Sequence, residues 1–398
     1  MKKFFAIFVL VLCASSILAQ TNFNQGKIKQ KSYMQVIPYQ KVKGTLIVIP
    51  VIISGKAYKF ILDTGASLYI SYKLSKELNL QIIGKTGVND ASGTEKEMDL
   101  ILLPELNLQG ITFVNTPGII EQEGAFLLNC LGVDGLIGSN MLRNSVVQFN
   151  DQSGHIIITN DIKKLSVKNT VKQKMELTQI QSNPYIVIGL KKGGAKASNK
   201  VLFDTGAANF YKMAISVYDW VNGRADIFDK IAEGEGSFSL GAHGAFEKQR
   251  HLLLNSPEII VAETSFSNVV ITTTNSSRSR IGSKLLQYGI TTLDYKKKHF
   301  YFKPFDNINT KELSERPWSI STTISNNKMI VGVIWDKTLE SQINLGDEIL
   351  SVNGFDYQQM DTCELLNFDN IFSDELMVLV ELRDIKTGEI KKVEIKRM

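Results

Sequence analysis

The sequence is poor in the residues that build most metal sites and disulfide frameworks. Its 398 residues include only three cysteines and four histidines. Apart from Cys13, the remaining cysteines, Cys130 and Cys363, lie far apart, so no disulfide framework or zinc-ligand spacing is recognisable. The histidines are scattered and form no HExxH pattern. We therefore expect no metal site and no cofactor, with Cys130 in a buried core.

Strong charge and long apolar runs are also scarce. The net charge of +5 is too mild to indicate nucleic-acid binding. The apolar run at residues 4–12 is too short to span a membrane, follows two lysines and precedes Ala19. This pattern predicts a signal peptide over residues 1–19 and export to the periplasm or the extracellular space, with no transmembrane span.

What the sequence does contain is a recurring β pattern. Short apolar or alternating runs, such as LIVIPVIISGKAYKFIL at 46–62, are separated by turns rich in Gly, Asn, Asp and Lys. Helical signals are few and short, at 72–80 and 215–223. The pattern predicts a mainly β protein with sandwich or barrel architecture.

An internal repeat organises most of the chain. FILDTGAS at 60–67 returns as VLFDTGAA at 201–208, and each copy follows a hairpin pattern. An apolar-Gly-Ser segment comes 75 residues after the first aspartate, at Gly138, and 78 residues after the second, at Gly282. Matched landmarks in the same order predict two copies of one β module.

The boundaries follow from the repeat and from a change in composition. We predict a first copy over residues 20–165 and a second copy over residues 166–308. A polar, charged stretch then precedes a compact α+β module over residues 316–398, which we call the C-terminal module.

Duplication of Asp-Thr-Gly supplies two carboxylates, Asp63 and Asp204, which would meet where the two copies face each other. Two carboxylates in contact cannot both ionise cheaply, so they share one proton. The ionised member can take a proton from water while the protonated member donates to a carbonyl oxygen. The pair therefore predicts hydrolysis without a covalent intermediate.

The neighbouring residues suit such a pair. Gly65 and Gly206 allow the backbone to approach and to donate to the carboxylates, which a Cβ would obstruct. Thr64 and Thr205 can reach across to the opposite copy and lock the two loops together.

Residues 40–305 resemble the aspartic proteases, in which hydrophobic-hydrophobic-Asp-Thr-Gly is followed about 75 residues later by hydrophobic-hydrophobic-Gly. The resemblance implies a bilobal pepsin/retropepsin-like fold and an aspartic endopeptidase acting on polypeptides. Arg280 departs from the usual apolar residue of the later motif. Ala66 and Ala207 follow the glycines, as in many retroviral-type members, which leads us to expect activity at mildly acidic to near-neutral pH.

The same resemblance implies hairpins that close over the substrate. In the first copy this flap would span residues 87–100, with Ser92 and Gly93 at its tip, and in the second copy residues 234–246.

The C-terminal module resembles a PDZ domain. INLGDEILSVNG at 343–354 is similar to the Leu-x-Gly-Asp-x-Ile-Leu-x-Val-Asn-Gly core of bacterial PDZ domains. Such domains bind extended peptides or C-termini by strand addition. The chain as a whole looks like the exported bacterial proteins that join a retroviral-type protease to a PDZ domain.

Other interpretations remain open at this stage. A lone Asp-Thr-Gly is also good turn chemistry. Ser139 and Ser283 would be ordinary loop residues, and His243 could contact substrate. The alternative function is a catalytically inactive envelope protein that binds peptides.

Overall fold

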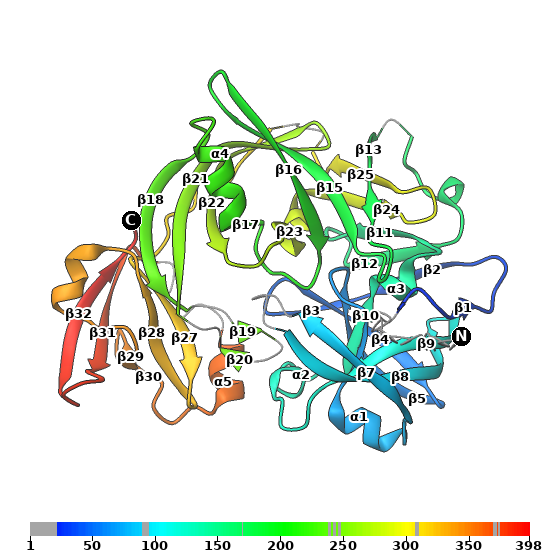
Figure 1. Ribbon diagram of the computed structural model, residues 1–398, viewed down its shortest axis with the longest axis horizontal. Coiled ribbons are helices and arrows are strands. Elements are labelled where there is room, and N and C mark those ends of the chain that lie inside the picture. The colour runs from blue at the N-terminus through cyan, green and yellow to red at the C-terminus, as the bar shows by residue number, and fades with distance from the viewer. Residues whose placement is uncertain are drawn as a thin grey trace, which may run out of the picture.

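The computed structural model is mainly β, as the sequence predicts, with 54% strand and 12% helix (Figure 1). It describes residues 22–89, 95–168, 170–237, 240–241, 244–245, 248–306, 310–368, 372 and 375–398. The expected signal peptide at residues 1–19 lies outside the described residues. No helix within these described ranges is long and apolar enough to cross a membrane.

The first copy forms a nine-stranded sheet, and one of its strands, β5, ends at Asp63. In this sheet β5 lies between β4, which runs antiparallel, and β10, which runs parallel to it. Alternate residues of β4 are buried on the core side, as expected for a strand with one face in the core. The strands are β1 (Lys27–Ile28), β3 (Gln40–Val42), β4 (Leu46–Ile53), β5 (Lys56–Asp63), β6 (Leu68–Ile70), β7 (Ile82–Asn89), β8 (Glu95–Leu108), β9 (Ile111–Ile120) and β10 (Gly135–Gly138).

The second copy repeats this arrangement around Asp204. Here β16 ends at Asp204 and pairs with β15, antiparallel, and with β23, parallel. The strands are β14 (Glu176–Leu177), β15 (Pro184–Lys192), β16 (Ala195–Asp204), β17 (Tyr211–Ala214), β18 (Asp229–Gly236), β21 (Gln249–Val261), β22 (Thr264–Thr274) and β23 (Arg280–Gly282), with a small separate hairpin of β19 (Leu240–Gly241) and β20 (Gly244–Ala245). A strand beyond residue 308, β26 (Thr310–Glu312), pairs with β22.

A six-stranded sheet joins the two copies. Its order is β13-β25-β24-β11-β12-β2, and the central pair β11–β24 brings one hairpin from each copy side by side. One large apolar core runs through both copies. The strands are β2 (Met34–Pro38), β11 (Val146–Asn150), β12 (His155–Thr159), β13 (Val171–Lys174), β24 (Gly289–Asp294) and β25 (His299–Pro304).

The helices are short, and two of them occupy equivalent places. Both stretches expected to be helical contain one: α1 (Tyr72–Glu77) follows β6, and α4 (Ile215–Asn222) follows β17. Ser71 caps α1 by accepting a hydrogen bond from the backbone N–H of Leu74 at 3.1 Å. The other helical turns are α2 (Leu127–Cys130), α3 (Ser139–Leu142), α5 (Thr362–Asn367), and the 3₁₀ turns η1 (Ile162–Lys164), η2 (Ser283–Tyr288) and η3 (Lys337–Ser341).

The C-terminal module has its own apolar core but continues the sheet of the second copy. The junction is between β18 and β28, where Gly236 pairs with Val333 and Ser237 N–H donates to Gly332 O at 3.0 Å. In Figure 1 the module (orange to red) lies beside β18 and β21. Its strands are β27 (Ile320–Ser325), β28 (Lys328–Ile334), β29 (Glu348–Val352), β30 (Phe355–Asp356), β31 (Met377–Arg383) and β32 (Ile390–Lys396).

A disulfide attaches the same module to the first copy. Cys130 at the end of α2 is buried, but it is bonded to Cys363 of α5, with a Cα–Cα distance of 4.6 Å. The side-chain amide of Asn367 also donates to the Cys130 carbonyl. The sequence interpretation of Cys130 as a core cysteine without a recognisable disulfide is thus corrected: the 233-residue separation hides the pairing.

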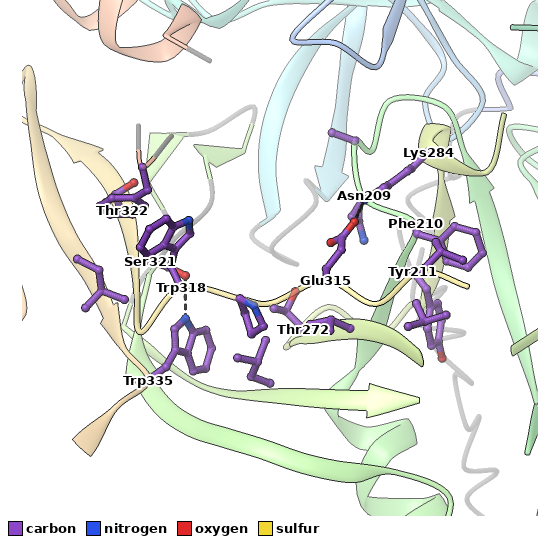
Figure 2. Close-up of a pocket in the computed structure, with 18 residues that line it drawn as sticks. Asn209, Phe210, Tyr211, Thr272, Lys284, Glu315, Trp318, Ser321, Thr322 and Trp335 are labelled. Carbon is purple, nitrogen blue, oxygen red and sulfur yellow. Dashed lines mark hydrogen bonds and ion pairs between the residues drawn. The ribbon is translucent and has the colours of Figure 1, made fainter. Parts of the chain in front are cut away.

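A cavity of about 480 Å³ lies at the junction of the second copy and the C-terminal module (Figure 2). Trp318, Trp335 and Phe210 contribute aromatic surface to its walls. The indole N–H of Trp335 donates to Ser321 Oγ at 2.8 Å.

Candidate active site

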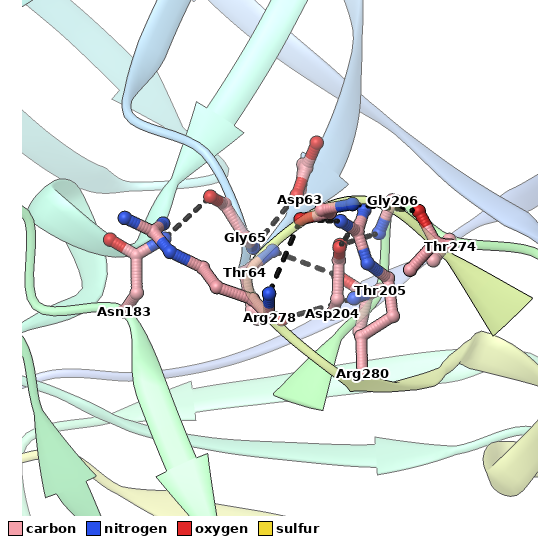
Figure 3. A network of polar contacts seen from close by, with 12 residues as sticks. Asp63, Thr64, Gly65, Asn183, Asp204, Thr205, Gly206, Thr274, Arg278 and Arg280 are labelled. Carbon is pink, nitrogen blue, oxygen red and sulfur yellow. Dashed lines mark hydrogen bonds and ion pairs between the residues drawn. The ribbon is translucent and has the colours of Figure 1, made fainter. Parts of the chain in front are cut away.

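The two Asp-Thr-Gly loops face each other, and each begins where a buried strand ends (Figure 3). Gly65 N–H donates to Asp63 Oδ1 at 2.8 Å, and Gly206 N–H donates to Asp204 Oδ1 at 3.0 Å. Each carboxyl therefore receives a hydrogen bond from its own loop, which fixes its orientation.

Thr64 and Thr205 hold the two loops together by reciprocal hydrogen bonds. Thr64 Oγ1 donates to Phe203 O at 2.6 Å and accepts from Thr205 N–H at 3.0 Å. Thr205 Oγ1 donates to Leu62 O at 2.6 Å and accepts from Thr64 N–H at 3.1 Å. Both threonines are fully buried, so these four bonds are shielded from water.

Each glycine of the pair lies against the carboxyl of the opposite copy. A Cβ on Gly65 would come within 2.7 Å of Asp204 Cγ, and one on Gly206 within 2.3 Å of Asp63 Oδ2. Real Cβ atoms do not approach that closely, so neither position can carry a side chain without moving a carboxyl. This packing brings Asp63 and Asp204 together from opposite sides of the repeat.

The environment favours a proton on Asp63. Burial is the main cause that raises the pKa of Asp63, and the charge of Asp204 raises it further. The Gly65 N–H and the Arg280 guanidinium oppose this rise without reversing it. Two carboxyl groups in contact cannot both ionise cheaply, so one proton is shared between them.

Arg280 provides the charge that distinguishes the two aspartates. Its Nη1 lies 3.4 Å from Asp204 Oδ2, and both side chains are about nine-tenths buried. The Arg280 guanidinium thus places a positive charge against the Asp204 carboxyl. The equivalent position in the first copy is Leu136, since Leu136 and Arg280 both lie two residues before the glycine of the later motif. The departure noted in the sequence is therefore a direct contact with the candidate site.

The later glycines support the loops from below. Gly138 pairs with Asp63 and Gly282 with Asp204. A Cβ on Gly138 would lie 2.3 Å from the Ser67 backbone, and one on Gly282 would lie 2.1 Å from the Asn209 carbonyl oxygen. The glycine that follows each aspartate by 75 or 78 residues is therefore needed because the backbone at that point packs directly against the backbone of the aspartate loop.

Three further residues were missed as parts of the site. Ser139 Oγ donates to Thr64 O at 2.7 Å, and Ser283 Oγ donates to Ala207 O at 2.9 Å, so neither is an ordinary loop residue. Their repetition after each glycine was the available signal. Asn183 donates from its side-chain amide to Gly65 O, and nothing in its local sequence marks it.

The predicted flap of the first copy is only partly described. β7 and β8 form the expected antiparallel hairpin. Ser92 and Gly93, predicted at its tip, lie outside the described residues. In the second copy, β18 and β21 form the corresponding hairpin, and His243 lies outside the described residues.

Known proteins are similar to part of this chain. Residues 49–141, which include Asp63 and Gly138, match the family model described as "Aspartyl protease". Among solved structures, a retropepsin-like aspartic protease from Rickettsia conorii is similar at 18% identity over 33% of this chain and 95% of that chain, with a TM-score of 0.25. No curated protein matches. The segment of the first copy that carries Asp63 is thus similar to aspartyl protease sequences.

Proposed function

We propose that the protein is an exported aspartic endopeptidase that hydrolyses peptide bonds with a water molecule activated between Asp63 and Asp204. The observation that carries this proposal is the contact of Gly65 and Gly206 with the opposite carboxyls. This packing holds the two carboxyls close together, and two carboxyls that close cannot both ionise, so they share one proton.

The charges assign different tasks to the two carboxyls. Asp204, which contacts the Arg280 guanidinium, would take a proton from water as the water oxygen attacks the carbonyl carbon, while Asp63 would give its proton to the carbonyl oxygen. On collapse, Asp204 passes its proton to the amide nitrogen and the C–N bond breaks. Asp63 then recovers a proton from the tetrahedral hydroxyl, so the pair returns to its starting state.

The expected pH range follows from the same arrangement. Loss of the proton from Asp63 removes the acid, and the raised pKa of Asp63 delays that loss. We propose activity at mildly acidic to near-neutral pH. A profile with activity only in strong acid would contradict this part of the proposal.

The chain as a whole would form a bilobal aspartic protease followed by a PDZ-like module. The module contains the motif at 343–354, where Asp347 is fully buried and accepts from Asn344 N–H at 2.8 Å and Ile385 N–H at 2.9 Å. Lys391 pairs with the same carboxylate at 2.7 Å. This module would bind an extended peptide or a C-terminus and so guide substrates to the aspartate pair.

Export is supported by the disulfide and by the predicted signal peptide. Disulfides such as Cys130–Cys363 persist in oxidising compartments and are rare in the cytosol. We propose a periplasmic or extracellular location.

Cleavage of an unfolded protein substrate across pH 3–8 tests the proposed activity. Wild type should cleave, and Asp63→Asn and Asp204→Asn should each lose at least about 100-fold in kcat/KM, the usual contribution of a general acid or base. Asp151→Asn, which removes a carboxylate paired with Lys41 outside the site, is the matched control. Equal activity in all proteins would reject the pair. An inactive but folded wild type would favour the peptide-binding alternative.

A further inference from the structure

The cavity between the second copy and the C-terminal module has walls from both parts (Figure 2). Asn209 and Phe210 come from the segment that follows the second Asp-Thr-Gly loop, and Asn209 lies five residues after Asp204. Trp318 and Trp335 come from the C-terminal module. The cavity volume of about 480 Å³ lies within the roughly 300–1,000 Å³ that ligand sites usually enclose.

The aromatic residues of the walls are held in place by contacts of their own. The Phe210 ring packs against the Phe266 ring, with 4.8 Å between the ring centroids. Trp335 is buried, and its indole N–H is hydrogen-bonded. Rings fixed in this way form a surface that is already in place before a ligand arrives, and such a surface suits the flat ring of an aromatic group.

The cavity wall also contains a polar group that lacks a partner. The side-chain amide nitrogen of Asn209 is buried, and no hydrogen-bond acceptor for it lies among the residues that the structure describes. A buried donor without an acceptor is costly, so folded proteins usually satisfy such groups. Ser321 Oγ accepts the Trp335 N–H, so the hydroxyl proton of Ser321 can serve as a second donor. Both groups favour a ligand that carries acceptor oxygens.

The charges on the cavity wall balance. Lys284 and Glu315 are the two charged residues among the described residues that line the cavity, and they form an ion pair with each other. An ionised ligand group would have to compete with this pair or lose its hydration without a counter-charge. The lining therefore favours an uncharged ligand.

We propose that this cavity binds an uncharged aromatic side chain of a polypeptide, with a backbone carbonyl of the same segment accepting from the Asn209 amide. A peptide carbonyl is the neutral acceptor that this buried donor lacks, and it accompanies every aromatic side chain of a polypeptide. The site is distinct from strand addition to the C-terminal module, because part of its wall belongs to the second copy. The inference goes beyond the proposed peptidase function, since binding here requires no cleavage.

Tryptophan fluorescence tests the binding directly. The chain has three tryptophans, of which Trp318 and Trp335 line the cavity and Trp220 is exposed on α4. Full-length Trp220→Phe with Asp63→Asn, which prevents loss of peptide by cleavage, is titrated with acetyl-Ala-Phe-Ala-amide. We expect a saturable change in fluorescence. Peptides in which alanine, glutamate or lysine replaces the phenylalanine should bind at least about 10-fold more weakly, because they bury no aromatic ring.

Asn209→Leu, made in the same background, tests the proposed hydrogen bond. Leucine removes the donor at similar volume, so affinity for the phenylalanine peptide should fall by about 5- to 10-fold. Asn222→Leu, which replaces an exposed asparagine at the end of α4, is the matched control and should bind unchanged. Trp318→Leu removes a ring from the module's wall and should also weaken binding, which keeps the inference testable if Asn209→Leu does not fold.

Three results would overturn the inference. The first is the absence of saturable binding of the phenylalanine peptide, or equally tight binding of the glutamate or lysine peptide. The second is an unchanged affinity in folded Asn209→Leu and Trp318→Leu, which would place the peptide elsewhere on the protein. The third is toluene binding as tightly as the peptide, which would show that no carbonyl is needed. None of these results depends on cleavage, so the proposed function is tested separately.

Discussion

At the scale of single residues, the candidate site depends on glycines that leave room for the carboxyls and on one buried arginine. The glycines of the two loops leave room for the opposing carboxyls. Arg280 stands where the first copy has Leu136, and its charge makes a symmetric arrangement asymmetric. Each feature leads to a substitution with a defined effect.

Gly206→Ala should separate the carboxyls without unfolding the protein. Its Cβ would lie 2.3 Å from Asp63 Oδ2, so the carboxyl must move by a distance that matters for catalysis. We expect a loss of roughly 100-fold in kcat/KM, measured on a peptide substrate. Gly194→Ala, in the turn between β15 and β16 with open space around its Cβ, should retain wild-type activity. Wild-type kcat/KM in Gly206→Ala would contradict the packing argument.

Arg280→Leu should shift the pH dependence of the reaction to higher pH. The guanidinium lowers the pKa of Asp63, so its removal should raise that pKa. Because Asp63 is the proposed acid, the alkaline limb of kcat/KM against pH should move up by about one pH unit, with Arg280→Lys closer to wild type. Lys200→Leu removes an exposed positive charge from the same strand as Asp204 and should leave the alkaline limb in place. An unmoved alkaline limb in Arg280→Leu would show that Arg280 does not act on Asp63.

At the scale of elements, the corresponding hairpins of the two copies are attached differently. The β18–β21 hairpin of the second copy continues through β28 into the C-terminal module. The two strands β18 and β28 lie close together at this junction, because a Cβ on Gly332 would lie 2.0 Å from Ser237 O. The β7–β8 hairpin of the first copy, in contrast, pairs within its own sheet.

Gly332→Val tests whether β18 and β28 are held together at this junction. The added side chain cannot fit against the Ser237 carbonyl, so β18 and β28 should separate and the backbone amides near Gly236 should exchange hydrogen faster. Hydrogen–deuterium exchange read by mass spectrometry measures this directly. Ile330→Val, a small change on the same strand, serves as the control. Unchanged hydrogen exchange of the β18 amides in Gly332→Val would contradict this account of the β18–β28 junction.

At the scale of the whole molecule, the C-terminal module links the two copies. It shares a sheet with the second copy and a disulfide with the first. The two copies also meet in the six-stranded sheet and at the aspartate loops. The geometry between the copies is thus held at three separate places.

Removal of the Cys130–Cys363 disulfide should weaken the link between the first copy and the C-terminal module. Cys130→Ser with Cys363→Ser should lower the free energy of unfolding by about 2–4 kcal/mol, because the bond closes a loop of 233 residues. Chemical denaturation with and without reductant measures the effect. Reductant should shift wild type to the midpoint of the double variant and leave that variant unchanged. Equal midpoints for all samples would show that the link does not contribute to stability.

The sequence could predict the features that are local and repeated. The mainly β pattern, the aspartates and the later glycines all lie in short segments that occur twice. The contact between Arg280 and Asp204 joins residues 76 apart, and the disulfide joins residues 233 apart. No local pattern encodes such distances. Asn183, which supports Gly65, likewise becomes recognisable only when the two loops are folded together.

The most direct test of the central claim compares the two single asparagine variants with the double variant. If Asp63 and Asp204 act as one unit, kcat/KM of Asp63→Asn, of Asp204→Asn and of the double variant should fall to the same low level, because loss of either carboxyl already removes the shared proton system. Substantial activity in either single variant, or a double variant whose loss is the product of two moderate losses, would contradict the account.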